Sequence, residues 1–364
     1  MKKALSLFLA LALLFCCSSA LSFADEASPD LSGWTDVVQL AVDDRCILGL
    51  RADGSVLRWG GEKYGLDQVD SWTDMQRLLF VSPNWEEHYV FGLKKDGTVI
   101  STSEADLSDW HDIVKIVTSK GYWVAGLKKD GTVIVTKKGE LNEFDSWGDG
   151  WLDVSDWRGV VDLIPTEGWT AINGLVGLFS DGTVRFIENT DDPNNDKPYN
   201  EYINSWSDII QVCSTLDGPF GLRADGTLAM PPWAEEPDAY EAATLPPTQW
   251  RDVVFLCSGF QDDIFAVTAD GRVECATAGM ELPVPYAQKI TEWRDVEALC
   301  SHYSVLLGLR TDGTVLWAGD RRLEALSTWS GVKELVVEQV GASCWIFGLR
   351  LDGSVLFLGL PDYY

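Results

Sequence analysis

Histidine and basic residues are scarce in this chain of 364 residues. Its 3 histidines are His88, His111 and His302, so any mechanism that needs an imidazole base must use one of them. Lysine and arginine number 28 against 56 aspartates and glutamates, which gives a formal net charge of −28. A field of that sign repels phosphate backbones and anionic membrane surfaces. We therefore expect no nucleic-acid partner.

Recognised catalytic patterns are also missing. The sequence has no phosphate-binding Walker loop, no dinucleotide-binding glycine pattern, no His-Glu-x-x-His and no Gly-x-Ser-x-Gly. Asp145, Asp149 and Asp153 lie four apart, whereas a calcium loop needs ligands two apart, so a solvated acidic surface is the better interpretation. We predict a protein that is not an enzyme and that has no cofactor and no metal site.

Long apolar runs are absent beyond the N-terminus. Lys2 and Lys3 precede an apolar run at 4–15, and Ser22-Phe23-Ala24 places small residues at the two positions that define a cleavage site. We predict a signal peptide at 1–24 and an extracellular or cell-surface protein. No later run is long enough for a membrane span.

Two cysteines in the apolar run leave a lipoprotein open as an alternative. Cys16 and Cys17 could be acylated after processing, but the bulky residues Leu13, Leu14 and Phe15 stand where a lipobox has small ones. Cleavage after residue 24 is the favoured interpretation.

Two repeated phrases fill the rest of the chain. Gly-Leu-x-x-Asp-Gly-Ser/Thr-Val recurs eight times, with its Asp at 53, 96, 130, 181, 225, 270, 312 and 352. The sixth copy departs most, with Ala266-Val267 and Arg272. A second phrase, Trp-x-Asp/Gly followed by apolar residues, has its Trp at 34, 72, 110, 157, 206, 250, 293 and 329. Asp-Gly between apolar runs indicates a tight hairpin, and the apolar run after each Trp indicates a buried strand.

A repeat of roughly 40 residues that forms a sheet of three or four strands cannot bury both faces of that sheet by itself. Such repeats must stack on their neighbours, and a radial arrangement protects their faces and edges. We therefore predict an all-β fold, a single closed β-propeller at 25–364, with the repeated Trp side chains packed between blades. An open β-solenoid is the competing interpretation.

These residues resemble the regulator-of-chromosome-condensation (RCC1-like) repeat. Segments 57–60 and 316–319, Leu-Arg-Trp-Gly and Leu-Trp-Ala-Gly, look like that family's hairpin endings, and the similarity covers 34–360. It implies a propeller whose well-known members have seven blades, although eight complete repeats here favour eight. The acidic, exported chain is more similar to bacterial extracellular members, among them an inhibitor of β-lactamase, than to nuclear ones.

Three enlarged connections are the candidate binding loops. Segments 137–156, 187–204 and 229–249 are rich in acids and in turn-forming residues, which places them at the surface. They hold aromatic residues outside the repeat phrases, and such side chains either cover the rim or bind a partner. The candidate contact residues are Trp147, Trp151, Trp233 and Tyr240.

These features indicate a general class of function but no specific ligand. We expect a monomeric, non-catalytic binding or scaffold protein that recognises another extracellular protein through these loops, and the acids favour a basic partner. A carbohydrate-binding or cell-surface structural module is one alternative, and a glycan-cleaving propeller is another.

The cysteines beyond the signal peptide indicate buried free thiols. Cys213, Cys257 and Cys300 occupy the same place in consecutive repeats, seven residues after the repeated Trp. Other repeats have an apolar residue there, so we expect small buried side chains rather than a disulfide framework.

Overall fold

A computed structural model describes most of the repeat region. The residues that it describes are 28–43, 46–83, 86–119, 123–137, 140–141, 152–166, 174–188, 199–215, 218–235, 242–243, 246–259, 263–277, 289–302, 305–340 and 343–361. The predicted signal peptide lies outside these ranges.

Eight antiparallel sheets follow one another along the chain, one for each repeat. Each begins with a strand that starts three residues after the repeated Trp. These first strands are β1 (Val37–Asp43), β4 (Met75–Val81), β7 (Ile113–Ser119), β10 (Val160–Thr166), β13 (Ile209–Thr215), β17 (Val253–Ser258), β20 (Val296–His302) and β23 (Val332–Val340).

The Asp-Gly hairpin supplies the other two strands of each sheet. The second strands are β2 (Cys46–Arg51), β5 (Tyr89–Lys94), β8 (Trp123–Lys128), β11 (Gly174–Phe179), β14 (Gly218–Arg223), β18 (Ile264–Thr268), β21 (Val305–Arg310) and β24 (Ser343–Arg350). The third strands are β3 (Val56–Gly60), β6 (Val99–Ser101), β9 (Val133–Val135), β12 (Val184–Glu188), β15 (Leu228–Ala229), β19 (Val273–Thr277), β22 (Val315–Ala318) and β25 (Val355–Leu360).

Short elements lie in the connections between sheets. A two-residue strand, β16 (Ala242–Ala243), pairs with β19 and makes that sheet four-stranded. Short helices among the described residues include η1 (Glu62–Tyr64), η2 (Leu66–Ser71), α2 (Tyr199–Ile203), η3 (Pro232–Glu235), η4 (Pro247–Gln249) and η5 (Arg321–Thr328).

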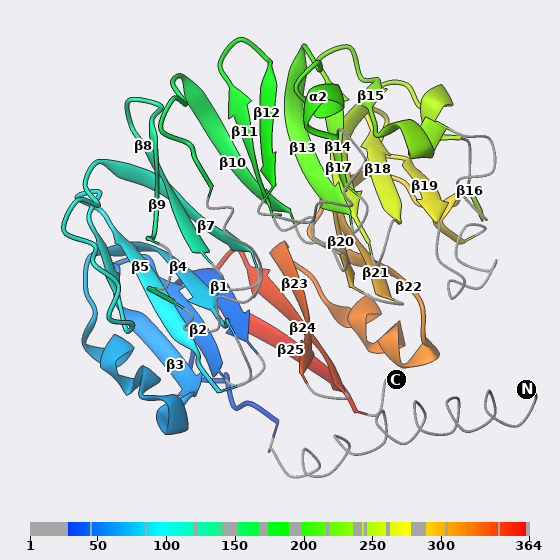
Figure 1. The fold of residues 1–364 in the computed structure, drawn as a ribbon. Helices are drawn as coiled ribbons and strands as arrows, with labels where there is room; N and C mark the ends of the chain where they lie inside the picture. The colour runs from blue at the N-terminus through cyan, green and yellow to red at the C-terminus, as the bar shows by residue number, and fades with distance from the viewer. Residues whose placement is uncertain are drawn as a thin grey trace, which may run out of the picture.

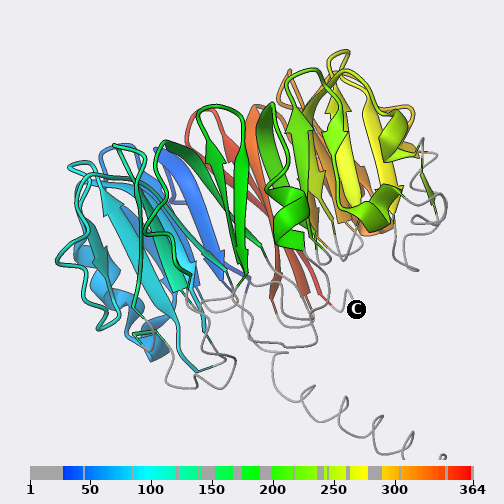
Figure 2. The same ribbon diagram turned by 45° about the horizontal axis from the view of Figure 1, so that its top comes forward.

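The sheets are arranged side by side around a common centre, with the first strands innermost (Figure 1). Turning the molecule shows this arrangement from the side, with the strands of the sheets running in roughly the same direction across its thickness (Figure 2). This all-β arrangement fits a β-propeller, and its eight sheets agree with the eight repeats in the sequence.

One backbone hydrogen bond joins each sheet to the next. The amide of Met75 in the second sheet donates to the carbonyl of Gly54 in the hairpin turn of the first, at 3.0 Å. Equivalent bonds join every later pair, and the amide of Val37 in the first sheet donates to Gly353 of the eighth at 3.0 Å. The last sheet thus contacts the first in the way that all other neighbours contact each other.

That joint explains why Asp or Gly stands two residues after the repeated Trp. The six aspartates there have φ between 57° and 60°, and the two glycines, Gly159 and Gly331, have φ of 75° and 68°. Asp and Gly tolerate this left-handed conformation better than most residues do. The turn glycine is equally restricted, because a Cβ on Gly54 would lie 2.9 Å from the Cα of Asp74.

Each repeated Trp is packed between two sheets, as the sequence predicts. Trp206 is 4% exposed and shares a hydrophobic cluster with Val176 of the fourth sheet and Ile209 of the fifth. Its ring also covers Gly221, where an added Cβ would lie 3.1 Å from the ring. The described residues form eight such clusters, each with members from two neighbouring sheets. The core is therefore distributed among the interfaces between sheets.

Side chains near the centre add further links between neighbouring first strands. The Gln39 side chain accepts from the Leu78 amide at 3.0 Å and donates to its carbonyl at 2.8 Å. Gln211 makes the same pair of bonds to Leu256, each at 3.0 Å. Such a side-chain amide takes the place of a peptide group and continues the hydrogen bonding from one sheet to the next.

The hairpin turns are fastened by their own aspartates. In seven of the eight, one carboxylate oxygen accepts from both the amide and the hydroxyl of the Ser or Thr two residues later, as Asp312 does from Thr314 at 2.9 and 2.6 Å. In the sixth turn Asp270 instead accepts from Thr268 and Arg272. Hydrogen bonds to these exposed carboxylates lower the pKa of all eight aspartates.

Replacing Trp206 with alanine should destabilise the fold by about 3–5 kcal/mol, because the change leaves a cavity between two sheets. Urea unfolding of the variant measures this loss, and His111→Ala, at an exposed position in an equivalent phrase, is the control. A loss below about 1 kcal/mol would contradict the interface role of Trp206.

Replacing Asp312 with alanine should lower the melting temperature at neutral pH by an amount that disappears in acid. The pKa of this carboxyl is lowered from 3.8 in the folded state, so its stabilisation is present above that value and is lost as the pH falls through the folded pKa. Thermal melts of wild type and variant from pH 7 to pH 2 measure the difference. Glu297→Ala, at an exposed strand position, is the control, and a difference independent of pH would contradict the assignment.

Candidate functional site

Of the four aromatic residues predicted to contact a partner, the structure describes one. Trp147, Trp151 and Tyr240 lie outside the described residues, whereas Trp233 lies in η3 and is half-buried. Its ring makes an edge-to-face contact with Phe220, with the centroids 6.0 Å apart. Trp233 packs against the clusters on both sides of the fifth sheet, so it contributes to the rim as well as presenting surface.

A hydrogen bond connects two of the enlarged connections near Trp233. The Tyr202 hydroxyl in α2 donates to the Glu235 carboxylate in η3 at 2.9 Å. Burial raises the pKa of Tyr202 to about 12, with a smaller contribution from Glu235, so the phenol stays protonated and remains a donor. The described helices of the two connections, α2 and η3, therefore lie next to each other.

His88 forms a cluster with Ser82 and Asp43 that brings together the residue types of a hydrolase. The Nδ1 atom of His88 lies 3.0 Å from Asp43 Oδ1 and 3.1 Å from Ser82 Oγ, and Ser82 also donates to Asp43 at 2.6 Å. A catalytic triad needs the serine and the carboxylate on opposite ring nitrogens. Here both contact the same nitrogen and the His88 side chain is buried, so the cluster fits a link between the first two sheets better than a catalytic site.

The other two histidines have contrasting surroundings. His111 is exposed and its Nδ1 lies 2.9 Å from Asp112 Oδ2. His302 ends the first strand β20, and burial lowers its pKa to about 4, so it is neutral at physiological pH.

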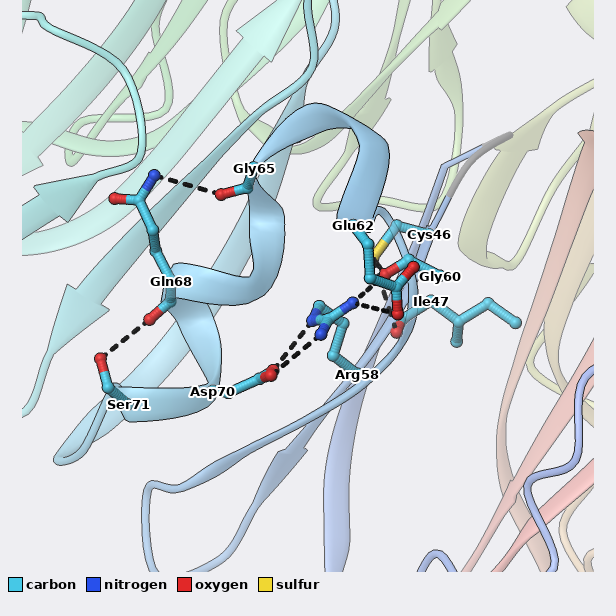
Figure 3. Close-up of polar contacts among 9 residues, drawn as sticks. All are labelled: Cys46, Ile47, Arg58, Gly60, Glu62, Gly65, Gln68, Asp70 and Ser71. Carbon is cyan, nitrogen blue, oxygen red and sulfur yellow. Dashed lines mark hydrogen bonds and ion pairs between the residues drawn. The ribbon is translucent and has the colours of Figure 1, made fainter.

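The Arg58 guanidinium is surrounded by polar groups of the protein itself (Figure 3). The guanidinium makes two bonds to the Asp70 carboxylate at 2.9 Å each and an ion pair with Glu62 at 2.9 Å, and it also donates to the Gly60 carbonyl. These bonds hold η1 and η2 against β3. Four of the five N–H donors of the guanidinium are thus bound to groups of the protein itself, so we assign this cluster a structural role.

The three equivalent cysteines are free thiols, but they are half-buried rather than buried as the sequence suggested. Cys213, Cys257 and Cys300 lie on first strands, which border the centre of the molecule, so no further strand covers their inner side. The thiols themselves are well shielded, and burial raises the pKa of Cys213 to about 12 and that of Cys300 to about 11.

One end of the sheets, which we call the hairpin face, combines two segments of every repeat. These are the five turn residues 51–55, 94–98, 128–132, 179–183, 223–227, 268–272, 310–314 and 350–354, and the four residues after each repeated Trp. The two segments are joined by backbone hydrogen bonds, as from Ala52 to Asp36 within a sheet and from Val37 to Gly353 between sheets.

The hairpin face is almost neutral. It holds 15 acidic and 13 basic residues, although the chain has 56 acidic and 28 basic residues in all. Nearly all of the net charge of −28 therefore lies elsewhere on the molecule. The enlarged connections 137–156, 187–204 and 229–249 leave from the opposite ends of the third strands, and together they hold 15 acidic and 3 basic residues.

The hairpin face also carries the exposed apolar side chains. Among the described residues, six large hydrophobic side chains are strongly exposed, and all six lie on this face: Val38, Val114, Val161, Ile210, Val254 and Leu351. The first five occupy the same repeat position, four residues after the Trp, and their side chains are 42% to 56% exposed. At this position a β-bulge interrupts the pairing of the first strand with the second. In the other three sheets this position holds Gln76, Glu297 and Lys333.

Neither a metal-binding cluster nor a membrane span emerges from the described residues. No group of three or more histidine, cysteine, aspartate or glutamate side chains there is placed to hold a metal ion. None of the helices in that part of the chain has the length and apolar character that crossing a membrane requires.

Known proteins resemble this chain in structure but not in sequence. No family model matches the sequence, and no curated protein matches it. Similar solved structures include yeast RCC1 (Prp20) bound to Kap60, at 12% identity over 89% of this chain and 80% of that one, with a TM-score of 0.41. Another is the BP39L lectin from Burkholderia pseudomallei, at 10% identity over 90% of this chain and 97% of that one, with a TM-score of 0.44.

The three equivalent thiols should react slowly with iodoacetamide in the folded protein at pH 8, because alkylation requires the thiolate and their pKa values are raised. Unfolding without a reductant should expose all three to the reagent, and peptide mass spectrometry measures each labelled site. A disulfide between any two of them would contradict the assignment.

Proposed function

We propose that this protein is an exported, non-catalytic binding protein built on a closed eight-bladed propeller, and that it recognises a basic protein through the enlarged connections. The observation that carries the proposal is the uneven charge: the hairpin face is nearly neutral, whereas the three enlarged connections hold 15 acidic and 3 basic residues. Acidic loops on a rigid ring attract a basic partner and orient it before contact.

Ring closure is supported by the contacts of the first sheet with the eighth. Trp34 and Val37 share a hydrophobic cluster with Trp345 and Phe347, in addition to the hydrogen bond from Val37 to Gly353. Closure fixes the sheets from which the connections leave, so a partner binds without the entropic cost of ordering the scaffold.

Hydrogen exchange tests closure at a single amide. The Val37 amide should exchange as slowly as those of Met75 and Ile113, which make the equivalent bond between adjacent sheets. Exchange measured by NMR gives all three values in one sample. If Val37 exchanges rapidly while the other two are protected, the ring is open between the eighth and first sheets.

The experiment that tests the function is affinity capture of partners by the secreted protein, followed by binding measurements with the partner identified. Trp151→Ala with Trp233→Ala should weaken binding at least about ten-fold, and higher salt should weaken binding further because the attraction between charges is screened. Val254→Gln, on the hairpin face, is the control. Retention by a polysaccharide instead of a protein, or unchanged affinity in a folded double variant, would overturn the proposal.

A further inference from the structure

The hairpin face has a composition that the proposed function does not use. All six strongly exposed large hydrophobic side chains of the described residues lie there, five of them at the same repeat position. Soluble proteins seldom gather exposed apolar side chains on one surface, and such patches mark protein–protein interfaces. Their concentration on this face indicates that another molecule binds over it in the functional state.

Positive and negative residues are interspersed on this face. In six of the eight turns a basic residue stands two positions before the aspartate, as Arg51 stands before Asp53 and Arg310 before Asp312. A surface of this kind has little net attraction for an acidic or a basic partner, and two copies of it can meet without net repulsion between their charges.

The net charge of the molecule restricts how two copies can approach. Each copy carries −28, and the enlarged connections are strongly acidic, so contacts through those connections are repulsive. The hairpin face, with 15 acidic and 13 basic residues, is the part of the surface where two copies meet with the least repulsion. A two-fold contact uses the same patch on both copies, and the central apolar residues then face each other.

We propose that two copies of this chain associate through their hairpin faces, with Val38, Val114, Val161, Ile210 and Val254 at the centre of the interface. This replaces the monomer expected from the sequence.

The dependence on salt concentration distinguishes this self-association from the binding of a basic partner. The apolar centre does not depend on salt in the way that charge pairs do, whereas repulsion between the acidic ends is screened. Self-association should therefore strengthen as salt is raised, opposite to the effect on the proposed partner. The two proposals consequently fail independently of each other.

Sedimentation equilibrium of the secreted protein over a wide concentration range tests the proposal. We expect a monomer–dimer equilibrium that Val161→Gln with Ile210→Gln weakens at least about ten-fold. Glutamine is tolerated at this position in the second sheet, as Gln76, so the variant should fold, and its melting temperature checks this. Glu201→Gln, in an acidic connection, is the control and should not weaken the dimer.

A wild-type protein that remains monomeric at every concentration and at high salt would overturn the proposal. So would a dimer that the double glutamine variant leaves unchanged, or one that dissociates as salt is raised. A dimer weakened by Glu201→Gln as strongly as by the double variant would place the interface on the acidic connections instead.

Discussion

The hydrogen bond between each hairpin turn and the next first strand is the constraint on which the rest of the structure depends. It brings the backbone of one sheet within contact distance of the next, so the turn must have a glycine without a Cβ and the facing residue must accept a positive φ. Once the backbones are that close, the Trp that precedes the joint fills the space between the sheets. The two phrases repeated in the sequence thus supply the two partners of one contact: the hairpin turn of one sheet and the start of the first strand of the next.

Much of the fold follows from the sequence for this reason. Four features could be predicted because the same residues recur in every repeat: the first strand, the hairpin, the number of sheets and the packing of Trp206 between sheets. The side chains that differ between repeats were harder to anticipate. Gln39 and Gln211 join first strands by mimicking a peptide group. Both stand five residues after the repeated Trp, but the other six repeats have other residue types there, so the repeat does not indicate this role.

The candidate site was only partly predictable. Surface aromatics in long connections could be named, but the sequence could not show that Trp233 packs on Phe220 or that Tyr202 bonds to Glu235 across two connections. The exposed position four residues after each Trp was equally hidden, because a β-bulge displaces a residue that an uninterrupted alternation would place in the core. Its signal was available in one respect: the position holds Gln, Glu and Lys in three repeats, which a core position would not tolerate.

The short third strands have a consequence for solubility. An outer strand exposes unpaired backbone groups that can recruit a strand of another molecule, and short strands offer few such groups. β6 and β9 have three residues each and β15 has two, while the five-residue β19 is paired with β16. The longer third strands each contact a short helix: β3 contacts η2, β12 contacts α2, and β22 and β25 contact η5. A protein with eight sheets, and therefore eight outer edges, is in this way protected against the edge-to-edge growth that leads to fibrils.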